Sequence, residues 1–102
     1  MSLYTVELAP VAQNQADTID IWWRTHRLAA SNLFDDEMAA AIGRLSTTPP
    51  LGAPYREFKG RAVHRLLLAR TSYHVYFHVQ EEQRRVRVLA VWHASRGREP
   101  RL

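Results

Sequence analysis

Basic side chains and one histidine in the second half of the chain have the chemistry to act on a phosphate group. Arg61, Arg65 and Arg87 offer guanidinium groups, which can hold a phosphate through two parallel hydrogen bonds. His93 stands at the end of a predicted strand and is the one residue there that can act as an acid or a base near neutral pH. Metal-free cleavage of RNA needs a base for the ribose 2′-hydroxyl, a cation for the phosphorus centre and an acid for the leaving oxygen. The candidates for such chemistry are the three arginines, Lys59 as a further point charge, and His93.

Three other histidines, at positions 64, 74 and 78, raise the question of a metal site. His74 and His78 stand apart on a predicted strand by roughly 13 Å, which is too far for both to bind one ion. The chain has no Cys, so thiolate sites are excluded as well. We therefore predict no metal and no cofactor. We expect His74 and His78 to lie on the polar face of their strand, alternating with Tyr76.

The basic residues are concentrated in one half of the sequence. Residues 1–55 hold three basic and six acidic residues, whereas residues 56–102 hold eleven basic and four acidic residues. Many arginines on a strand face are simply solvated. A segment this positive nevertheless favours an anionic partner, which is either nucleic acid or an acidic protein surface.

Length and composition indicate a single domain that spans residues 1–102. Of the 102 residues, 46% are hydrophobic and 24% are charged, and this composition is typical of a globular domain. A chain of 102 residues is too short to form two hydrophobic cores. No apolar run reaches the roughly 18 residues of a membrane span, and the first residues lack the pattern of a signal peptide. We therefore expect a cytoplasmic protein with no membrane partner.

The first half of the sequence predicts a strand and a helical hairpin. Apolar and polar residues alternate over residues 4–8, as in a half-buried strand, and Pro10 ends that pattern. Apolar residues then recur at steps of three and four over residues 10–27 and again over 30–45, which predicts two helices. Only a few residues separate the helices, so we expect them to be antiparallel. Residues 46–54 are rich in Pro and predict a loop.

The second half of the sequence predicts three strands and a tail. Alternating residues over 61–69, 73–80 and 85–92, joined by short polar turns, predict an antiparallel meander. On the last strand, we expect one face to hold Val86, Val88, Ala90 and Trp92. The basic tail over residues 97–102 is expected to be loose. The order β-α-α-β-β-β predicts a two-layer α+β fold, with the helical hairpin packed on an antiparallel sheet.

Two neighbouring tryptophans stand near the end of the first predicted helix. Adjacent helical residues point about 100° apart, so Trp22 and Trp23 cannot both face the core. We expect one ring to pack on the sheet and the other to lie at an edge. There it is either a boundary residue or an anchor in an apolar groove for a partner helix. An exposed sheet edge is a second surface that can accept a partner, in that case a strand.

These features together resemble the ParE branch of the RelE/ParE superfamily, toxins of bacterial type II toxin-antitoxin systems. The similarity extends over about residues 3–98. It rests on the segment 4–10, the first helix with Asp17, Ile19, Trp22 and Trp23, the spacing of Phe34, Ile42 and Leu45, the loop 50–52, Arg65, Tyr73, Tyr76 and the segment 93–96. Each fragment is short, and their order and spacing together carry the resemblance.

The resemblance implies a small toxin of a plasmid stabilisation module, neutralised by a cognate antitoxin encoded beside it. ParE-type toxins act on DNA gyrase, and RelE-type toxins on the same fold cleave mRNA on the ribosome. Many RelE-type enzymes have several Lys at the site and a Tyr near the C-terminus, whereas this chain has one Lys and no aromatic residue after Trp92. We therefore expect a gyrase inhibitor. The alternatives are a ribosome-dependent mRNA endonuclease and an inactive domain that only binds its partner.

The resemblance also places the toxic determinant in the C-terminal half of the chain. The predicted target-binding residues are Arg65, His93, Arg96 and Arg98. The predicted antitoxin-binding residues are Trp22, Trp23, Arg85 and Arg87. For the endonuclease alternative, the predicted catalytic residues are Arg61, Arg65 and His93. A histidine at position 93 fits both branches of the superfamily and does not discriminate between them.

Overall fold

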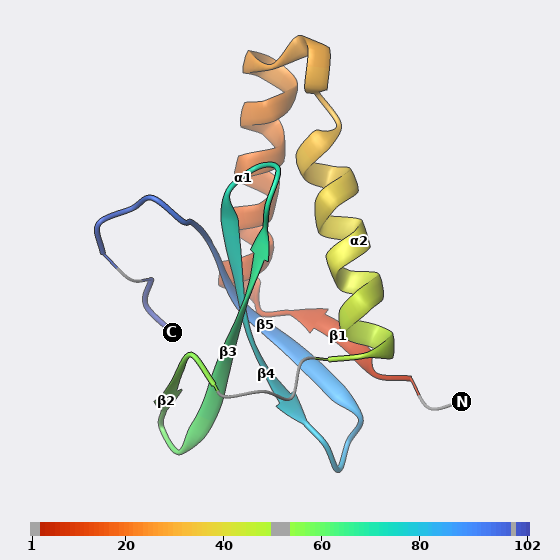
Figure 1. The fold of residues 1–102 in the computed structure, drawn as a ribbon, viewed down its shortest axis with the longest axis vertical. Coiled ribbons are helices and arrows are strands. Elements are labelled where there is room, and N and C mark those ends of the chain that lie inside the picture. The colour runs from red at the N-terminus through yellow and green to blue at the C-terminus, as the bar shows by residue number, and fades with distance from the viewer. Residues whose placement is uncertain (1–2, 50–53, 99) are drawn as a thin grey trace.

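The computed structural model describes residues 3–49, 54–98 and 100–102. The loop 50–52, which contributes to the resemblance, and Glu99 of the tail lie outside the described residues. Figure 1 shows the elements, which are in chain order β1 (Thr5–Leu8), α1 (Pro10–His26), the short 3-10 helix η1 (Leu28–Ala30), α2 (Leu33–Thr47), β2 (Arg56–Phe58), β3 (Arg61–Leu68), β4 (Tyr73–Gln80) and β5 (Arg85–His93). The second helix begins at Leu33 rather than at residue 30, because η1 takes up the connection.

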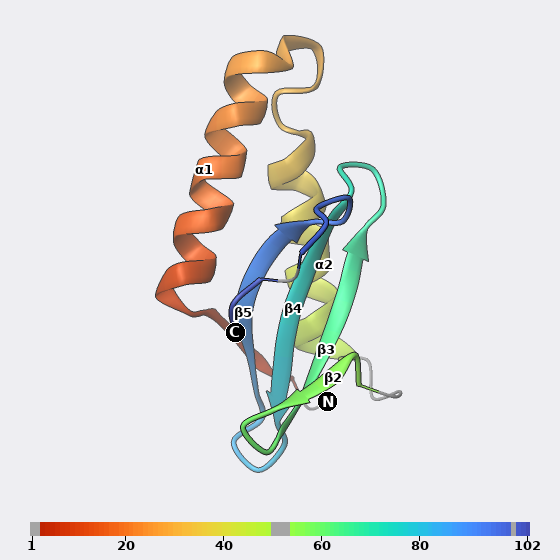
Figure 2. The ribbon, with the colours of Figure 1, turned by 90° about the vertical axis from the view of Figure 1, so that its left-hand side faces the viewer.

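The two helices pack on one face of the sheet, so the predicted α+β class is confirmed (Figure 2). The strand order is β1-β5-β4-β3-β2, and β3, β4 and β5 form the predicted antiparallel meander. The sheet is mixed, because β1 pairs in parallel with β5. Alternation indicates a strand and carries no information on its direction, so this pairing was not predictable.

A short strand, β2, extends the sheet beyond the predicted meander. It pairs with the first three residues of β3, from Arg56 opposite Val63 to Phe58 opposite Arg61. The tight turn between them has positive φ angles at Lys59 (54°) and Gly60 (77°), and the second is a conformation that glycine adopts without strain. Three residues are too few to show a period in the sequence, which is why the strand was missed.

The main core lies between the helices and the sheet. The predicted apolar stripes of both helices face it, with Ala12 and Ala16 on α1 and Phe34 and Leu45 on α2. Phe77 at the middle of β4 is fully buried beneath them. A large apolar side chain contributes about 2 kcal/mol when it is buried in this way.

A β-bulge in β5 corrects the predicted face of its last residues. Phe77 is opposite Val88 and Tyr76 is opposite Ala90, so Leu89 is an extra residue between two paired positions. The alternation therefore shifts by one position after Leu89. Val91 joins the core under the helices instead of facing away from Val88. Ala90 and Trp92 turn to the opposite face of the sheet.

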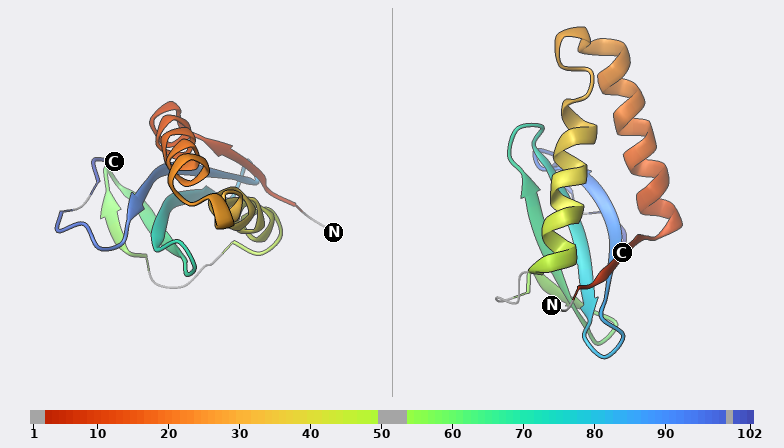
Figure 3. Two further views of the ribbon diagram at one scale, coloured as in Figure 1. Left: turned by 90° about the horizontal axis from the view of Figure 1, so that it is seen from above. Right: turned by 90° about the vertical axis from the view of Figure 1, so that its right-hand side faces the viewer.

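The face of the sheet away from the helices carries a second, smaller core, and this corrects two predictions. Tyr76 and His78 are buried there, not exposed on a polar face. The described residues of the tail are also not loose, because Leu102 packs on this core and the indole N–H of Trp92 donates to the carbonyl oxygen of Arg98 at 2.9 Å. Figure 3 shows the C-terminal segment on this side of the sheet. Apolar side chains on both faces require cover on both faces.

Two side chains from the helices fix the end of the sheet where β4 begins. The Glu37 carboxylate accepts hydrogen bonds from the backbone N–H of Arg70 (2.7 Å) and of Thr71 (3.0 Å), and from the Thr71 hydroxyl (2.6 Å). The Gln15 side-chain carbonyl accepts from the N–H of Val91 at 2.8 Å. These bonds hold the β3–β4 turn and the end of β5 against the helices.

Candidate functional site

The four predicted target-binding residues surround one small hollow beyond the end of β5. Arg65 comes from β3, His93 is the last residue of β5, and Arg96 and Arg98 follow it. The hollow has a volume of about 140 Å³, and its other walls include Tyr55, His74, Tyr76 and Trp92. We call Arg65, His93, Arg96 and Arg98 the cationic cluster.

Aromatic rings hold the guanidinium groups of the cationic cluster in place. The guanidinium carbon of Arg65 lies 4.2 Å from the centre of the Tyr55 ring. Those of Arg96 and Arg98 lie 4.3 Å and 5.9 Å from the centre of the Trp92 ring. Such stacking fixes the plane of a guanidinium while its N–H groups stay available to an acceptor. Within the described part of the chain, no carboxylate pairs with these three arginines.

The imidazole of His93 is oriented by two neighbours. Its Nδ1 accepts the backbone N–H of Ser95 at 3.2 Å and lies 2.7 Å from the Ser95 hydroxyl oxygen. The Tyr73 ring meets it edge-on, with the ring centres 4.9 Å apart. Because Nδ1 is the acceptor, the proton of the neutral ring belongs on Nε2. His93 can therefore donate a hydrogen bond to an anionic group in the hollow.

A second histidine at the hollow is kept neutral. Burial lowers the pKa of His74 below its ordinary value, and the positive charge of Arg65 lowers it further. A histidine with a depressed pKa adds no charge at pH 7. His74 therefore adds nothing to the positive charge that the arginines give the hollow.

Arg61 lies apart from the cationic cluster. Its Nη1 donates to Nε2 of the buried His78 at 3.1 Å. His78 is near the far end of β4 from Tyr73, and Tyr73 is the residue opposite His93. Tyr73 and His78 are five residues apart on β4, which is roughly 16 Å along the strand. The three residues predicted for an endonuclease are therefore not assembled at one place.

A larger groove adjoins the cationic cluster on the helical side of the sheet. It has a volume of about 550 Å³ and runs between α1 and the ends of β4 and β5. Its lining residues are Asn14, Gln15, Thr18, Ile19, Tyr73, Val91, Trp92, His93 and Arg96. We call it the α1 groove. Trp92, His93 and Arg96 belong to both the groove and the hollow.

A comparison with protein families identifies the chain at this point. The sequence matches the family described as "ParE toxin of type II toxin-antitoxin system, parDE" over residues 6–98. The chain belongs to the ParE toxin family. The predicted resemblance is confirmed, and the protein is a ParE-type toxin of a type II toxin-antitoxin system. A comparison with curated proteins gives no match.

Solved structures share the fold of this ParE-family chain. A chain of the chromosomal ParDE TA system from P. aeruginosa is similar with a TM-score of 0.71 and 16% identity, over 90% of this chain and 97% of that chain. A chain of the RelBE2 toxin-antitoxin complex from Mycobacterium tuberculosis has a TM-score of 0.62 and 23% identity, over 93% and 97%. The isolated E. coli RelE toxin has a TM-score of 0.60 and 17% identity, over 92% and 87%. At these identities the likeness establishes the fold, which both branches share.

The predicted antitoxin-binding residues of this ParE-family toxin differ in their accessibility. Trp22 is 40% exposed, and its ring stacks on His26 with the ring centres 4.9 Å apart. Trp23 is half-buried against the main core, as expected for one of the two rings. Arg87 donates to the Glu7 carboxylate at 2.9 Å, and Arg85 lies 3.9 Å from the same carboxylate. The Trp22 ring is thus accessible to a partner protein, whereas both arginines are already beside the Glu7 carboxylate of the same chain.

The sequence analysis missed most residues of the α1 groove. Gln15, Thr18 and Ile19 stand three and four positions apart, a spacing that indicates one helix face but not what lies opposite. Val91 reaches the groove only because the bulge at Leu89 turns it there. Among the described residues, no group of three or more His, Asp and Glu side chains is placed to hold a metal ion. The described helices include none that is both long and apolar enough to cross a bilayer.

Proposed function

We propose that this ParE-family toxin binds DNA gyrase, blocks replication and acts as a binding protein rather than an enzyme. The observation that carries the proposal is the split of the basic residues into two places. Arg65, His93, Arg96 and Arg98 surround one hollow, whereas Arg61 binds His78 at the other end of the sheet. A set of ring-stacked arginines beside a Trp has the composition of a binding hot spot. Its charge suits an acidic protein surface.

A ribosome-dependent mRNA endonuclease is the second candidate, and the cationic cluster itself favours it. Arg65 and Arg96 offer guanidinium forks for a phosphate, and the protonated form of His93 can serve as an acid for the leaving oxygen. No carboxylate is among the described residues that line the hollow. A nuclease here would therefore need the 2′-hydroxyl proton to be removed by a group from the ribosome or the RNA.

We further propose that a cognate antitoxin, encoded beside the toxin in a plasmid stabilisation module, neutralises it in the cytoplasm. The similar chains from P. aeruginosa and M. tuberculosis come from a toxin-antitoxin system and a toxin-antitoxin complex, which supports such a partner. The exposed Trp22 and the basic residues Arg85 and Arg87 are candidate contacts, because Trp anchors and charge complementarity are common features of tight interfaces.

Induction of the toxin without its antitoxin separates these functions. DNA synthesis, translation and mRNA integrity are followed in the same culture after induction. The proposal predicts that DNA synthesis stops first, an SOS response follows and mRNA stays intact. Rapid, site-specific mRNA cuts with continuing replication would refute gyrase inhibition and support the endonuclease. Normal growth at good expression would instead indicate an inactive, partner-binding domain.

A further inference from the structure

The end of the helical hairpin exposes large apolar side chains to water. Ile21 is 63% exposed, Trp22 is 40% exposed, and Leu28, the first residue of η1, is 80% exposed. Ile21 stands nine positions after the core residue Ala12, which places it on the opposite side of α1. The hairpin ends beyond the sheet, so the sheet does not cover these side chains (Figure 1). We call Ile21, Trp22 and Leu28 the hairpin apex, because a group of exposed apolar residues of this kind marks a contact surface.

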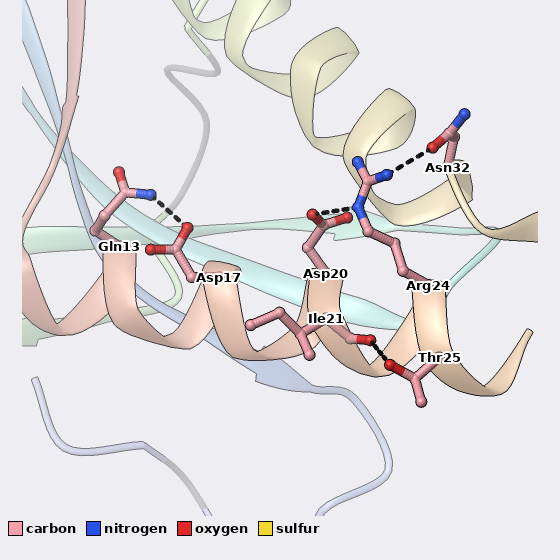
Figure 4. A network of polar contacts seen from close by, with 7 residues as sticks. All are labelled: Gln13, Asp17, Asp20, Ile21, Arg24, Thr25 and Asn32. Atoms are coloured by element: carbon pink, nitrogen blue, oxygen red, sulfur yellow. Dashed lines mark hydrogen bonds and ion pairs between the residues drawn. The ribbon is translucent and has the colours of Figure 1, made fainter.

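Hydrogen bonds within the hairpin hold the hairpin apex in shape. The Thr25 hydroxyl donates to the carbonyl oxygen of Ile21 at 2.7 Å. Arg24 joins the two helices, because its guanidinium donates to Asp20 on α1 at 2.8 Å and to the side-chain oxygen of Asn32, the residue before α2, at 3.2 Å. Figure 4 shows Arg24 turned toward Asn32, with Thr25 on another side of α1. A surface that is already ordered loses little conformational entropy when a partner binds.

The hairpin apex is nearly neutral, unlike the cationic cluster. Residues 20–36 hold two arginines and three aspartates. Arg24 is paired with Asp20, and the guanidinium carbon of Arg27 lies 5.1 Å from the centre of the Trp22 ring. Nucleic acid and anionic lipid surfaces are bound through an excess of positive charge, which this segment lacks. The hairpin apex therefore suits an apolar pocket of a protein.

The hairpin apex lies near the end of the sheet that carries the cationic cluster. The strand β5 runs to the cluster in the direction in which the hairpin projects (Figure 2). The helix α1 ends at His26, roughly 12 Å along its axis beyond Thr18, which lines the α1 groove together with Arg96. A large folded partner can therefore touch the apex and the cluster at the same time. A projecting apex needs a pocket on its partner, and a single helix or strand has no pocket.

We propose that the hairpin apex is a second target-binding contact, which inserts Ile21 and Leu28 into an apolar pocket on gyrase. This inference rests on the proposed gyrase function and adds an apolar contact to the charged one. Charge complementarity at the cationic cluster mainly speeds the encounter of the two proteins. Apolar side chains buried in a pocket mainly slow dissociation. The two surfaces therefore have separable effects on the kinetics of binding.

Surface plasmon resonance of the full-length toxin on purified gyrase tests the proposal. The double variant Ile21→Ser/Leu28→Ser removes apolar side chains from two exposed positions, where substitutions cost little stability. Leu3→Ser, at a position that is 55% exposed and precedes β1, is the matched control. We expect the double variant to raise the dissociation rate about tenfold with little change in the association rate. We expect Leu3→Ser to change either rate by less than about twofold.

Three results would overturn the proposal. One is a wild-type dissociation rate for the double variant, with its circular dichroism spectrum unchanged. Another is a wild-type toxin that dimerises in sedimentation and becomes monomeric with Ile21→Ser/Leu28→Ser, because the hairpin apex would then bind a second copy. The third is a double variant that keeps its gyrase kinetics and loses affinity for the product of the neighbouring reading frame, which would assign the apex to the antitoxin. A wild-type toxin that does not bind gyrase would refute the proposed function as well, whereas these three results leave that function standing.

Discussion

Arg61 donates a hydrogen bond to the buried ring of His78 at one end of the sheet, whereas His93 lies opposite Tyr73 at the other end. The two functional groups that a metal-free nuclease would combine therefore belong to different surfaces. Arg61 is part of a row of polar side chains that crosses the strands. In this row His78 is opposite Arg87, and Arg87 donates a hydrogen bond to Glu7. His93 belongs to the cationic cluster, which is separated from that row along β4.

Substitution of Arg61 should leave toxicity nearly unchanged. Arg61→Ala removes a bond to His78 and nothing from the cationic cluster. The double variant Arg65→Ala/Arg96→Ala should abolish growth inhibition, because it removes two guanidinium groups from the hollow. Survival after induction measures both, and Arg44→Ala at an exposed site on α2 controls for loss of positive charge. Loss of toxicity in Arg61→Ala at normal protein levels would contradict this account and favour the nuclease.

The stability of the fold should decrease as the pH falls below about 6.5. Burial, together with Arg61 and Arg87, lowers the pKa of His78 below its ordinary value. The unfolded chain then binds a proton that the folded chain does not, so the free energy of unfolding falls from the unfolded pKa downwards. His74 adds an effect of the same sign. Urea unfolding at pH 7.5 and 5.5 should show a smaller loss for His78→Gln than for the wild type, and an equal loss would contradict the assignment.

Loss of the Glu37 carboxylate should destabilise the fold through the β3–β4 turn. Glu37 accepts three hydrogen bonds, two of them from the backbone of Arg70 and Thr71. Glu37→Ala should lower the free energy of unfolding by about 2 kcal/mol, because two backbone donors lose a charged acceptor. The exposed Glu82, changed to Ala, is the control and should have little effect. Equal denaturation midpoints for the two variants would show that the turn does not depend on Glu37.

Truncation of the tail side chain at Leu102 should loosen the second core. Leu102 is half-buried and packs on the cluster that includes Val63, Tyr76 and Ala90. Leu102→Ala should lower the free energy of unfolding by about 1 kcal/mol, which is less than the roughly 2–5 kcal/mol of a fully buried Leu because the site is only half-buried. It should also increase the binding of an apolar dye to the sheet. Unchanged stability and dye binding would mean that the tail does not contribute to this core.

Local sequence patterns predicted the elements of this fold better than their pairing. The helical stripes that bury Ala12 and Phe34 and the alternation of β4 around Val75 are local, so they were readable. The parallel partner of β1 depends on how the chain returns in space. The bulge at Leu89 and the second core around Tyr76 depend on tertiary pairing, which has no local period.

The charged residues of the candidate site were predicted from the sequence, whereas the aromatic residues around them were not. Arg65, His93, Arg96 and Arg98 were named from the resemblance, and the fold brings them round one hollow. Their aromatic supports were not predicted, because Tyr55 and Trp92 meet the arginines only after β2 has paired with β3 and the tail has packed on the sheet. The neutral state of His74 likewise follows from burial, which a sequence does not show.

Supercoiling of relaxed plasmid by purified DNA gyrase is the most direct test of the central claim. We predict that the purified wild-type toxin blocks supercoiling and leaves mRNA intact in a translating extract. We also predict that Arg65→Glu/Arg96→Glu loses this inhibition, whereas Arg44→Glu keeps it. Full supercoiling in the presence of excess folded wild-type toxin, together with mRNA cleavage in the extract, would contradict the claim.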